Sequence, residues 1–285
     1  MSGTLFVVAT PIGNLEDITA RALRVLREAS IIAAEDTRRT AHLLARYAIS
    51  TPSTSLHEHN EGQKSGSLLA RLAGGEHVAL VSDAGTPTVS DPGRQLIAAA
   101  LDAGIRVEPI PGPNAAVAAL AASGMSGDSF TFLGFPPNRS KDRSEWFSRA
   151  RRAGGTIIFY EAPHRIRRTL EDLQREVGDC VVVVCREMTK AHEQLVKGPI
   201  STVLGLLVME VGEFTVVADV GQSGDRVTAD PPTTDEVFAE FCLMTKESGL
   251  TRRAAVSSLA RRYRMKPNDI YEMIERAKKS VEQPM

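Results

Sequence analysis

Val78-Ala79-Leu80-Val81-Ser82-Asp83-Ala84-Gly85-Thr86-Pro87 is the stretch that decides the fold of this chain of 285 residues. Its first four residues are apolar, and a short unbroken apolar run predicts a strand buried on both faces of a parallel sheet. Asp83 follows at the carboxyl end of the strand, and Gly85 and Pro87 then end it. Because open α/β sheets bind ligands at the carboxyl ends of their strands, this turn is a candidate part of a binding site. Taken alone, the segment fits an ordinary strand-to-helix connection equally well.

The pattern recurs along the first 120 or so residues. Strand, turn and helix alternate about four times, which predicts a parallel sheet with helices on both faces. Turns that are polar or rich in Gly and Pro also follow the other predicted strands, beginning at Thr10, Glu35 and Pro111. Such turns gather along one edge of a parallel sheet, so together they favour a ligand site over plain connectors.

The composition is that of a soluble globular protein, with 42% hydrophobic and 24% charged residues. Lys and Arg (34) nearly equal Asp and Glu (35), so any basic surface for a polyanionic partner must be local. The three cysteines have neither a metal-ligand spacing nor an even number for disulfides, which predicts reduced thiols in a cytoplasmic protein. No apolar run reaches membrane-spanning length, so no membrane partner is expected.

Several familiar motifs are missing, and this narrows the kind of site. The sequence contains no Gly-x-Gly, no Gly-Lys-Ser/Thr phosphate loop, no Gly-x-Ser-x-Gly elbow and no His-Glu-x-x-His. Only His57 and His59 lie close together among the histidines. A hydrogen-bonding loop is the more usual role at that spacing, so we expect no metal.

A second α/β domain is predicted after the small, polar segment 123–128. Apolar strand-like runs again end in polar residues, and a cleft is expected between the two domains. Residues 136–152 contain Arg139, Lys141 and Arg143 within a basic run, which fits either a solvated helix face or a surface that contacts phosphate. The predicted domains are residues 1–122, 123–229 and 230–285.

The third segment is predicted to be helical and basic. Two short helices flank a break at residues 263–266, as in a helix-turn-helix module. Between residues 251 and 279 the cations outnumber the anions nine to three. A dimerising helical tail would explain the segment, but the charge favours RNA contact. The cations expected at the RNA are Arg139, Lys141, Arg143, Arg252, Arg253, Arg264 and Lys266.

Seven motifs in fixed order resemble those of the ribosomal RNA methyltransferase branch of the tetrapyrrole methylase superfamily. They are Ala9-Thr10-Pro11-Ile12-Gly13-Asn14-Leu15, Glu35-Asp36-Thr37-Arg38, His57-Glu58-His59-Asn60, Ser82-Asp83-Ala84-Gly85-Thr86-Pro87, Pro111-Gly112-Pro113, Phe159-Tyr160-Glu161 with His164-Arg165, and Arg186-Glu187-Met188-Thr189-Lys190. The resemblance spans essentially the whole chain. The tetrapyrrole enzymes usually have a Gly-rich first loop, whereas this chain has Thr10-Pro11-Ile12-Gly13-Asn14, which favours an RNA substrate over a porphyrinoid.

The resemblance implies 2′-O-methylation, from S-adenosylmethionine, of a decoding-site cytidine in 16S rRNA. It also implies two α/β domains with the cofactor in the cleft between them, a homodimer, the small ribosomal subunit as partner and no DNA. Carried over by motif position, the expected cofactor contacts are Pro11, Asp83, Ala84, Gly85, Thr86, Asn114, Ala115, Ala116, Leu133, Tyr160, Met188, Gly212 and Glu213. A small-molecule methylase and a non-enzymatic ribosome-binding factor are the alternatives.

Three residues are candidates for the chemistry. A ribose hydroxyl is a poor nucleophile, so a base or a stabilising cation should lie beside it. Glu35 or Glu187 is the candidate for proton removal, and Lys190 for electrostatic stabilisation. For each of them, a purely structural ion pair is the alternative role.

Overall fold

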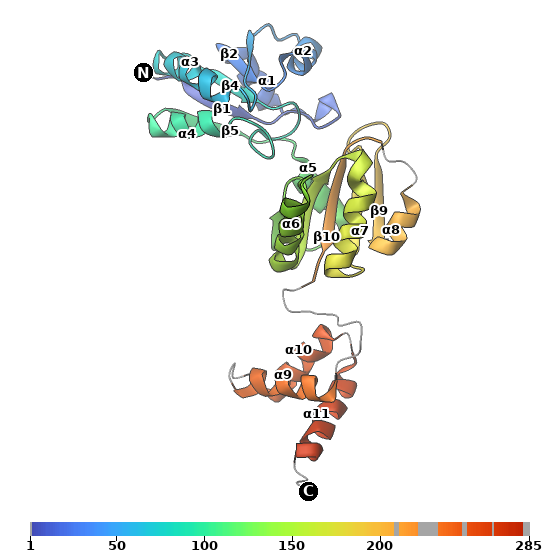
Figure 1. The fold of residues 1–285 in the computed structure, drawn as a ribbon. Helices are drawn as coiled ribbons and strands as arrows, with labels where there is room; N and C mark the ends of the chain where they lie inside the picture. The colour runs from blue at the N-terminus through green and yellow to red at the C-terminus, as the bar shows by residue number, and fades with distance from the viewer. Residues whose placement is uncertain (1, 208–210, 222–232, 247–249, 264, 282–285) are drawn as a thin grey trace. The chain divides into compact units, whose positions relative to one another are not determined.

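The computed structural model describes residues 2–207, 211–221, 233–246, 250–263 and 265–281 (Figure 1). The chain divides into two compact units, Met1–Val220 and Gly221–Met285. The first unit contains two five-stranded sheets. In the described part of the chain, no helix has both the length and the apolar character needed to cross a bilayer.

The first sheet is entirely parallel, as the alternation of strands and helices predicted. Its strand order is β3-β2-β4-β1-β5. Its strands are β1 (Thr4–Val8), β2 (Ile31–Ala34), β3 (Ser53–Ser55), β4 (Val78–Val81) and β5 (Arg106–Ile110). The helices between them are η1 (Leu15–Asp17), α1 (Ala20–Glu28), α2 (Thr37–Arg46), α3 (Glu61–Ala73) and α4 (Arg94–Asp102).

The central strand β4 is buried on both faces, which confirms the interpretation of its apolar run. Ala79 and Val81 face a cluster with α1 and α2, whereas Val78 and Leu80 face a cluster with α3 and α4. All four residues are at most 2% exposed. Helices therefore cover both faces, and the carboxyl end of β4 is left to form the site.

The second sheet is mixed, with strand order β6-β7-β10-β8-β9. Strand β10 lies antiparallel to both β7 and β8, and only the β6–β7 pair is parallel. Its strands are β6 (Phe130–Phe132), β7 (Thr156–Glu161), β8 (Val181–Arg186), β9 (Gln194–Pro199) and β10 (Phe214–Asp219).

Helices also cover both faces of the second sheet. The helices of one face are α6 (Ser140–Ala153), η2 with α7 (Pro163–Arg165 and Ile166–Val177) and α8 (Ile200–Leu206). The opposite face packs against α5 (Ala115–Ser123) through Ala116, Ala119 and Leu120. The predicted boundary at residues 122–123 assigns α5 to the first domain, whereas the helix packs on the second sheet.

The second unit is a bundle of three helices, α9 (Thr234–Lys246), α10 (Arg252–Arg262) and α11 (Pro267–Val281). Its core contains Phe241, Leu259 and Ile274. Thr251 caps α10, since its hydroxyl accepts a hydrogen bond from the Ala254 amide at 3.3 Å. The two helices expected on either side of residues 263–266 are therefore present.

Candidate active site

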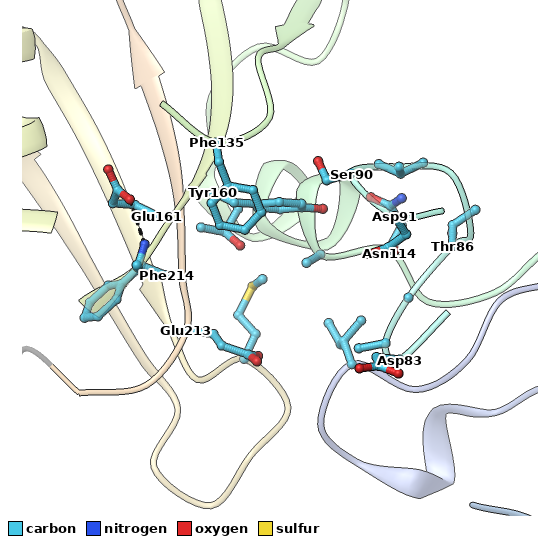
Figure 2. A pocket seen from close by; sticks show the side chains of 18 of the residues that line it. Asp83, Thr86, Ser90, Asp91, Asn114, Phe135, Tyr160, Glu161, Glu213 and Phe214 are labelled. Carbon is cyan, nitrogen blue, oxygen red and sulfur yellow. Dashed lines mark hydrogen bonds between the residues drawn. The ribbon is translucent and has the colours of Figure 1, made fainter. Parts of the chain in front are cut away.

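A cavity of about 400 Å³ lies where the strand ends of both sheets meet (Figure 2). The first sheet contributes the turns after β1, β2, β4 and β5, and the second sheet contributes residues around β6, β7, β8 and β10. The lining residues are Ile12, Glu35, Arg39, Asp83, Ala84, Gly85, Thr86, Val89, Ser90, Asp91, Asn114, Ala115, Phe135, Tyr160, Glu161, Ala162, Pro163, Met188, Glu213, Phe214 and Thr215.

Hydrogen bonds join the turns of the first sheet around Asp83. Its Oδ1 accepts from the Asp36 amide at 2.9 Å, and its own amide donates to Glu35 Oε2 at 3.2 Å. Arg39 Nε lies 3.5 Å from Asp83 Oδ2. Asp83 therefore ties the end of β4 to the end of β2.

The first loop is held against the loop that follows β4. Thr10 and Gly85 exchange two backbone hydrogen bonds, of 2.8 and 3.0 Å. Gly85 has φ +80°, a conformation that favours glycine. A second contact joins the first loop to the second sheet, because the Asn14 amide donates to Thr189 Oγ1 at 3.0 Å. The loops after β1, β4 and β8 thus support one another at the cavity.

Tyr160 lines the cavity from the second sheet. Its hydroxyl accepts a hydrogen bond from the Ala116 amide at 3.2 Å, and its ring contacts Phe132 and Phe135 at centroid distances of 4.9 and 5.4 Å. Figure 2 shows the hydroxyl directed toward the side where Asp91 and Asn114 lie. Burial raises the pKa of Tyr160, and the negative charge of Asp91 adds to the shift. The hydroxyl is therefore a neutral group at the cavity wall.

Two carboxyl groups in the cavity have raised pKa values. Burial raises the pKa of Asp91 to about 7, with further contributions from the charges of Glu35 and Asp83. Burial also raises the pKa of Glu35, and the charge of Asp83 adds to it, although the hydrogen bond from the Asp83 amide acts the other way. Perturbed carboxyl groups in a cleft are characteristic of functional sites.

Most of the expected cofactor contacts line the cavity. They are Asp83, Ala84, Gly85, Thr86, Asn114, Ala115, Tyr160, Met188 and Glu213. Asn114 also caps α5, because its Oδ1 accepts from the Val117 amide at 3.1 Å.

The other four expected contacts lie beside the cavity rather than in its wall. Pro11 lines a smaller pocket of about 80 Å³ that shares Arg39 and Asp83 with the cavity. Leu133 is buried in the core, and its carbonyl accepts from Trp146 Nε1. Ala116 reaches the site only through its amide, and Gly212 packs against Glu187.

The three proposed catalytic residues also divide into residues that line the cavity and residues that do not. Glu35 lines the cavity, whereas Glu187 and Lys190 are not among the lining residues. Lys190 Nζ lies 2.9 Å from Glu187 Oε1 and 3.0 Å from Glu213 Oε2. Burial would raise the pKa of Glu187, but the Glu213 amide and Lys190 hold it below its usual value. This geometry fits a structural ion pair for Glu187 and Lys190.

The expected RNA-contacting cations are exposed with one clear exception. Arg143 is 7% exposed, and its guanidinium donates to Asp172 Oδ2 and Thr169 Oγ1, each at 2.8 Å. Its assignment to the RNA surface was wrong, since the charge is already neutralised inside the fold. Arg139, Lys141, Arg252, Arg253 and Lys266 are exposed, and Arg264 lies outside the described residues.

The sequence interpretation missed several lining residues, above all Arg39, Asp91, Phe135 and Glu161. Glu161 belongs to one of the seven motifs, and Arg39 directly follows another. Both lie at or shortly after the end of a predicted strand, and that signal could have identified them. Phe135 comes shortly after β6 and is 52% exposed. Asp91 comes ten residues after β4, and only the course of the intervening loop returns it to the cavity.

The family model for Tetrapyrrole (Corrin/Porphyrin) Methylases matches residues 4–204. These residues include strands of both sheets and most of the cavity wall, so the fold and the site define a methylase of this class. Uroporphyrin-III C-methyl transferase from Thermus thermophilus, solved with S-adenyl homocysteine, superposes with a TM-score of 0.55 at 18% identity, covering 76% of this chain and 98% of that one. At that identity it shows the fold alone.

Closer relatives carry the name ribosomal RNA small subunit methyltransferase I. The relative from Synechocystis sp. is 41% identical over 274 residues, which is 95% of this chain and 97% of that protein. The relative from Vibrio cholerae is 41% identical over 273 residues, covering 94% and 93% of the two chains. The chain belongs to the family of ribosomal RNA small subunit methyltransferase I, and it is a methyltransferase.

Proposed function

We propose that the chain transfers the methyl group of S-adenosylmethionine to the 2′-hydroxyl of a decoding-site cytidine in 16S rRNA. The observation that supports this most is an acidic cavity between two sheets in a chain that is 41% identical, over 274 aligned residues, to a ribosomal RNA small subunit methyltransferase I. We further propose that it acts in the cytoplasm, where ribosomal subunits are found, and as a homodimer.

The cavity fits S-adenosylmethionine in size and charge. A volume of about 400 Å³ lies in the range of small-molecule sites. Among the described lining residues, five are carboxylic acids and one is a cation, Arg39. Glu161 and Glu213 are paired with Arg165 and Lys190, which leaves Glu35, Asp83 and Asp91 as the carboxylic acids set against Arg39. The sulfonium and ammonium groups of S-adenosylmethionine are both positive, so this remaining excess of carboxylates suits them. Apolar side chains such as Ile12, Val89 and Met188 offer contacts for the adenine ring.

The protein's contribution to the reaction is then chiefly alignment. S-adenosylmethionine supplies an electrophilic methyl group whose leaving group is a neutral thioether. The wall around Asp83 holds the donor on one side, while the ribose hydroxyl must enter in line with it. The contacts between the loops after β1, β4 and β8 keep that geometry.

The function is tested by mass analysis of 16S rRNA from cells that lack the protein. One methyl group should be missing from a cytidine ribose, and purified protein with S-adenosylmethionine should restore it on small subunits from those cells. An unchanged rRNA mass in those cells would contradict the proposal.

The helical second unit is proposed to contact the RNA. Charge reversal of two exposed cations, Arg253→Glu with Lys266→Glu, should weaken binding to small subunits about tenfold or more at moderate salt, because fewer phosphates are neutralised and fewer counterions are released. The salt dependence of binding should fall as well, with a log–log slope smaller by roughly 0.7 for each phosphate that is no longer neutralised.

Affinity for S-adenosylmethionine should not change in that variant, because the cavity is formed by residues of the first unit. A matched control reverses two exposed cations of α1, Arg24→Glu with Arg27→Glu. Equal weakening by both variants would show a general charge effect and refute a role for the second unit.

A further inference from the structure

We propose that Asp91 is the catalytic residue that accepts the proton of the attacking ribose hydroxyl. This inference rests on the proposed function, because it assigns the base for that reaction. Asp91 belongs to none of the seven motifs that resemble the family.

The position of Asp91 is central to the cavity. The Ser82 hydroxyl, at the end of β4, acts on the pKa of Asp91, although it donates to the Ala84 and Gly85 carbonyls at 3.4 and 3.5 Å. Asp91 also lies close enough to Glu35 and Asp83 for their charges to act on it. It also interacts electrostatically with Tyr160, which belongs to the second sheet. Asp91 therefore faces the space that both sheets enclose (Figure 2).

A strained loop holds Asp91 there. Thr88 and Ser90 both have φ 71°, in the left-handed region that residues with a side chain rarely adopt. For a β-branched residue such as Thr88 this backbone is especially unfavourable, and strain of this kind is concentrated at functional sites. A Cβ added at Gly134, on the second sheet's side, would lie 3.5 Å from Ser90 Oγ, so the loop packs closely against that side.

The other carboxylates of the cavity already have partners. Asp83 accepts from the Asp36 amide, and Glu35 accepts from the Asp83 amide. Glu161 pairs with Arg165, and Glu213 pairs with Lys190. In the part of the chain that the structure describes, Asp91 takes part in no ion pair, which leaves its carboxylate able to bind a substrate proton.

The charges around Asp91 suit this role. Glu35, Asp83 and Arg39 face the cavity from the first sheet, and Tyr160 and Glu213 from the second. The carboxylate of Glu161 is buried in its ion pair with Arg165. Burial and the negative neighbours raise the pKa of Asp91 to about 7. A base with a pKa near the working pH combines a useful ionised fraction with good proton affinity.

Proton transfer and methyl transfer occur together in this step. The O–H bond of the ribose breaks and its proton passes to an Asp91 oxygen. The ribose oxygen forms a bond to the methyl carbon, the bond from sulfur to that carbon breaks, and the electron pair remains on sulfur. Asp91 then releases the proton to water.

The test compares wild type, Asp91→Asn and Glu35→Gln on small subunits from cells lacking the protein. For wild type, kcat/KM should rise about tenfold per pH unit below roughly pH 7 and then level off. Asp91→Asn should lose about 100-fold or more in kcat/KM and should lose that pH dependence, while binding S-adenosylmethionine within about threefold of wild type by calorimetry. Glu35→Gln should keep the rise with pH, and Asp91→Glu should recover part of the rate.

Thermal unfolding of the ligand-free protein supplies a second readout. A carboxyl group with a raised folded-state pKa contributes stability at low pH that is lost as pH rises through that pKa. Asparagine does not titrate, so the Asp91→Asn variant does not lose this stability as pH rises. The Tm of Asp91→Asn minus the Tm of wild type should therefore be about 2–4 °C larger at pH 8 than at pH 4. This outcome also shows that the variant folds.

The outcomes separate the two proposals. If wild type transfers no methyl group to the subunits, the proposed function fails. If wild type is active and Asp91→Asn stays within tenfold of it, or if Glu35→Gln rather than Asp91→Asn abolishes the pH dependence, the assignment of Asp91 alone is overturned.

Discussion

Replacing Glu161 by glutamine should lower the Tm of the first unit by about 6–12 °C, because a buried ion pair loses its anion. The Glu161 side chain is fully buried and lies 3.2 Å from Arg165 Nε. It also accepts hydrogen bonds from the Ala162 amide at 2.8 Å and from the Thr169 hydroxyl. Removing one partner of a buried pair costs about 3 kcal/mol or more, and each kcal/mol shifts Tm by roughly 2–4 °C at this size.

The effect extends through a chain of hydrogen bonds. Thr169 donates to Glu161 and accepts from Arg143, which in turn pairs with Asp172. Glu171→Gln is a matched control, since Glu171 is exposed on the same helix, α7, and should leave Tm within about 1 °C. Combining Glu161→Gln with Arg165→Met should recover part of the loss, because no unpaired charge stays buried. A Tm change below about 2 °C for Glu161→Gln would contradict the prediction.

The sequence predicts the first sheet better than the second for a physical reason. The run Val78–Val81 can be buried on both faces only inside a sheet covered by helices, and the structure has this arrangement. In the second sheet, β10 runs antiparallel to its neighbours β7 and β8. An apolar run specifies burial but carries no information on strand direction, so the mixed sheet was not predictable from the alternation alone.

The site was predictable where its residues directly follow strands. Glu35 and Asp83 do so, whereas Asp91 is returned to the cavity by a loop with left-handed residues at Thr88 and Ser90. Neither Thr nor Ser signals that backbone conformation. For Arg143, in contrast, the sequence does carry a signal. Trp146 three residues later and the apolar Ala150 seven residues later place Arg143 on the buried face of α6. Helical spacing could therefore have excluded it from the RNA surface.

Asp83 has a structural role and an electrostatic role, and an experiment can separate the two. Its Oδ1 holds the Asp36 amide, which joins the ends of β2 and β4, and its charge faces a cavity with few cations. Asparagine keeps an oxygen for the Asp36 amide but removes the charge. Asp83→Asn therefore tests the electrostatic role, whereas Asp83→Ala would also break the link between the strands.

Asp83→Asn should weaken binding of S-adenosylmethionine by about 10- to 100-fold, which corresponds to about 1.4–2.8 kcal/mol at roughly 1.4 kcal/mol per decade. Binding of S-adenosylhomocysteine, whose sulfur is neutral, should weaken less, because part of the lost attraction acts on the sulfonium. Calorimetry with both ligands measures the difference, and Asp102→Asn, at the exposed end of α4, is the control. Unchanged affinity for both ligands would exclude Asp83 from the cofactor site. An equal loss for both would place its charge against a group that the two ligands share, such as the ammonium, and not against the sulfonium.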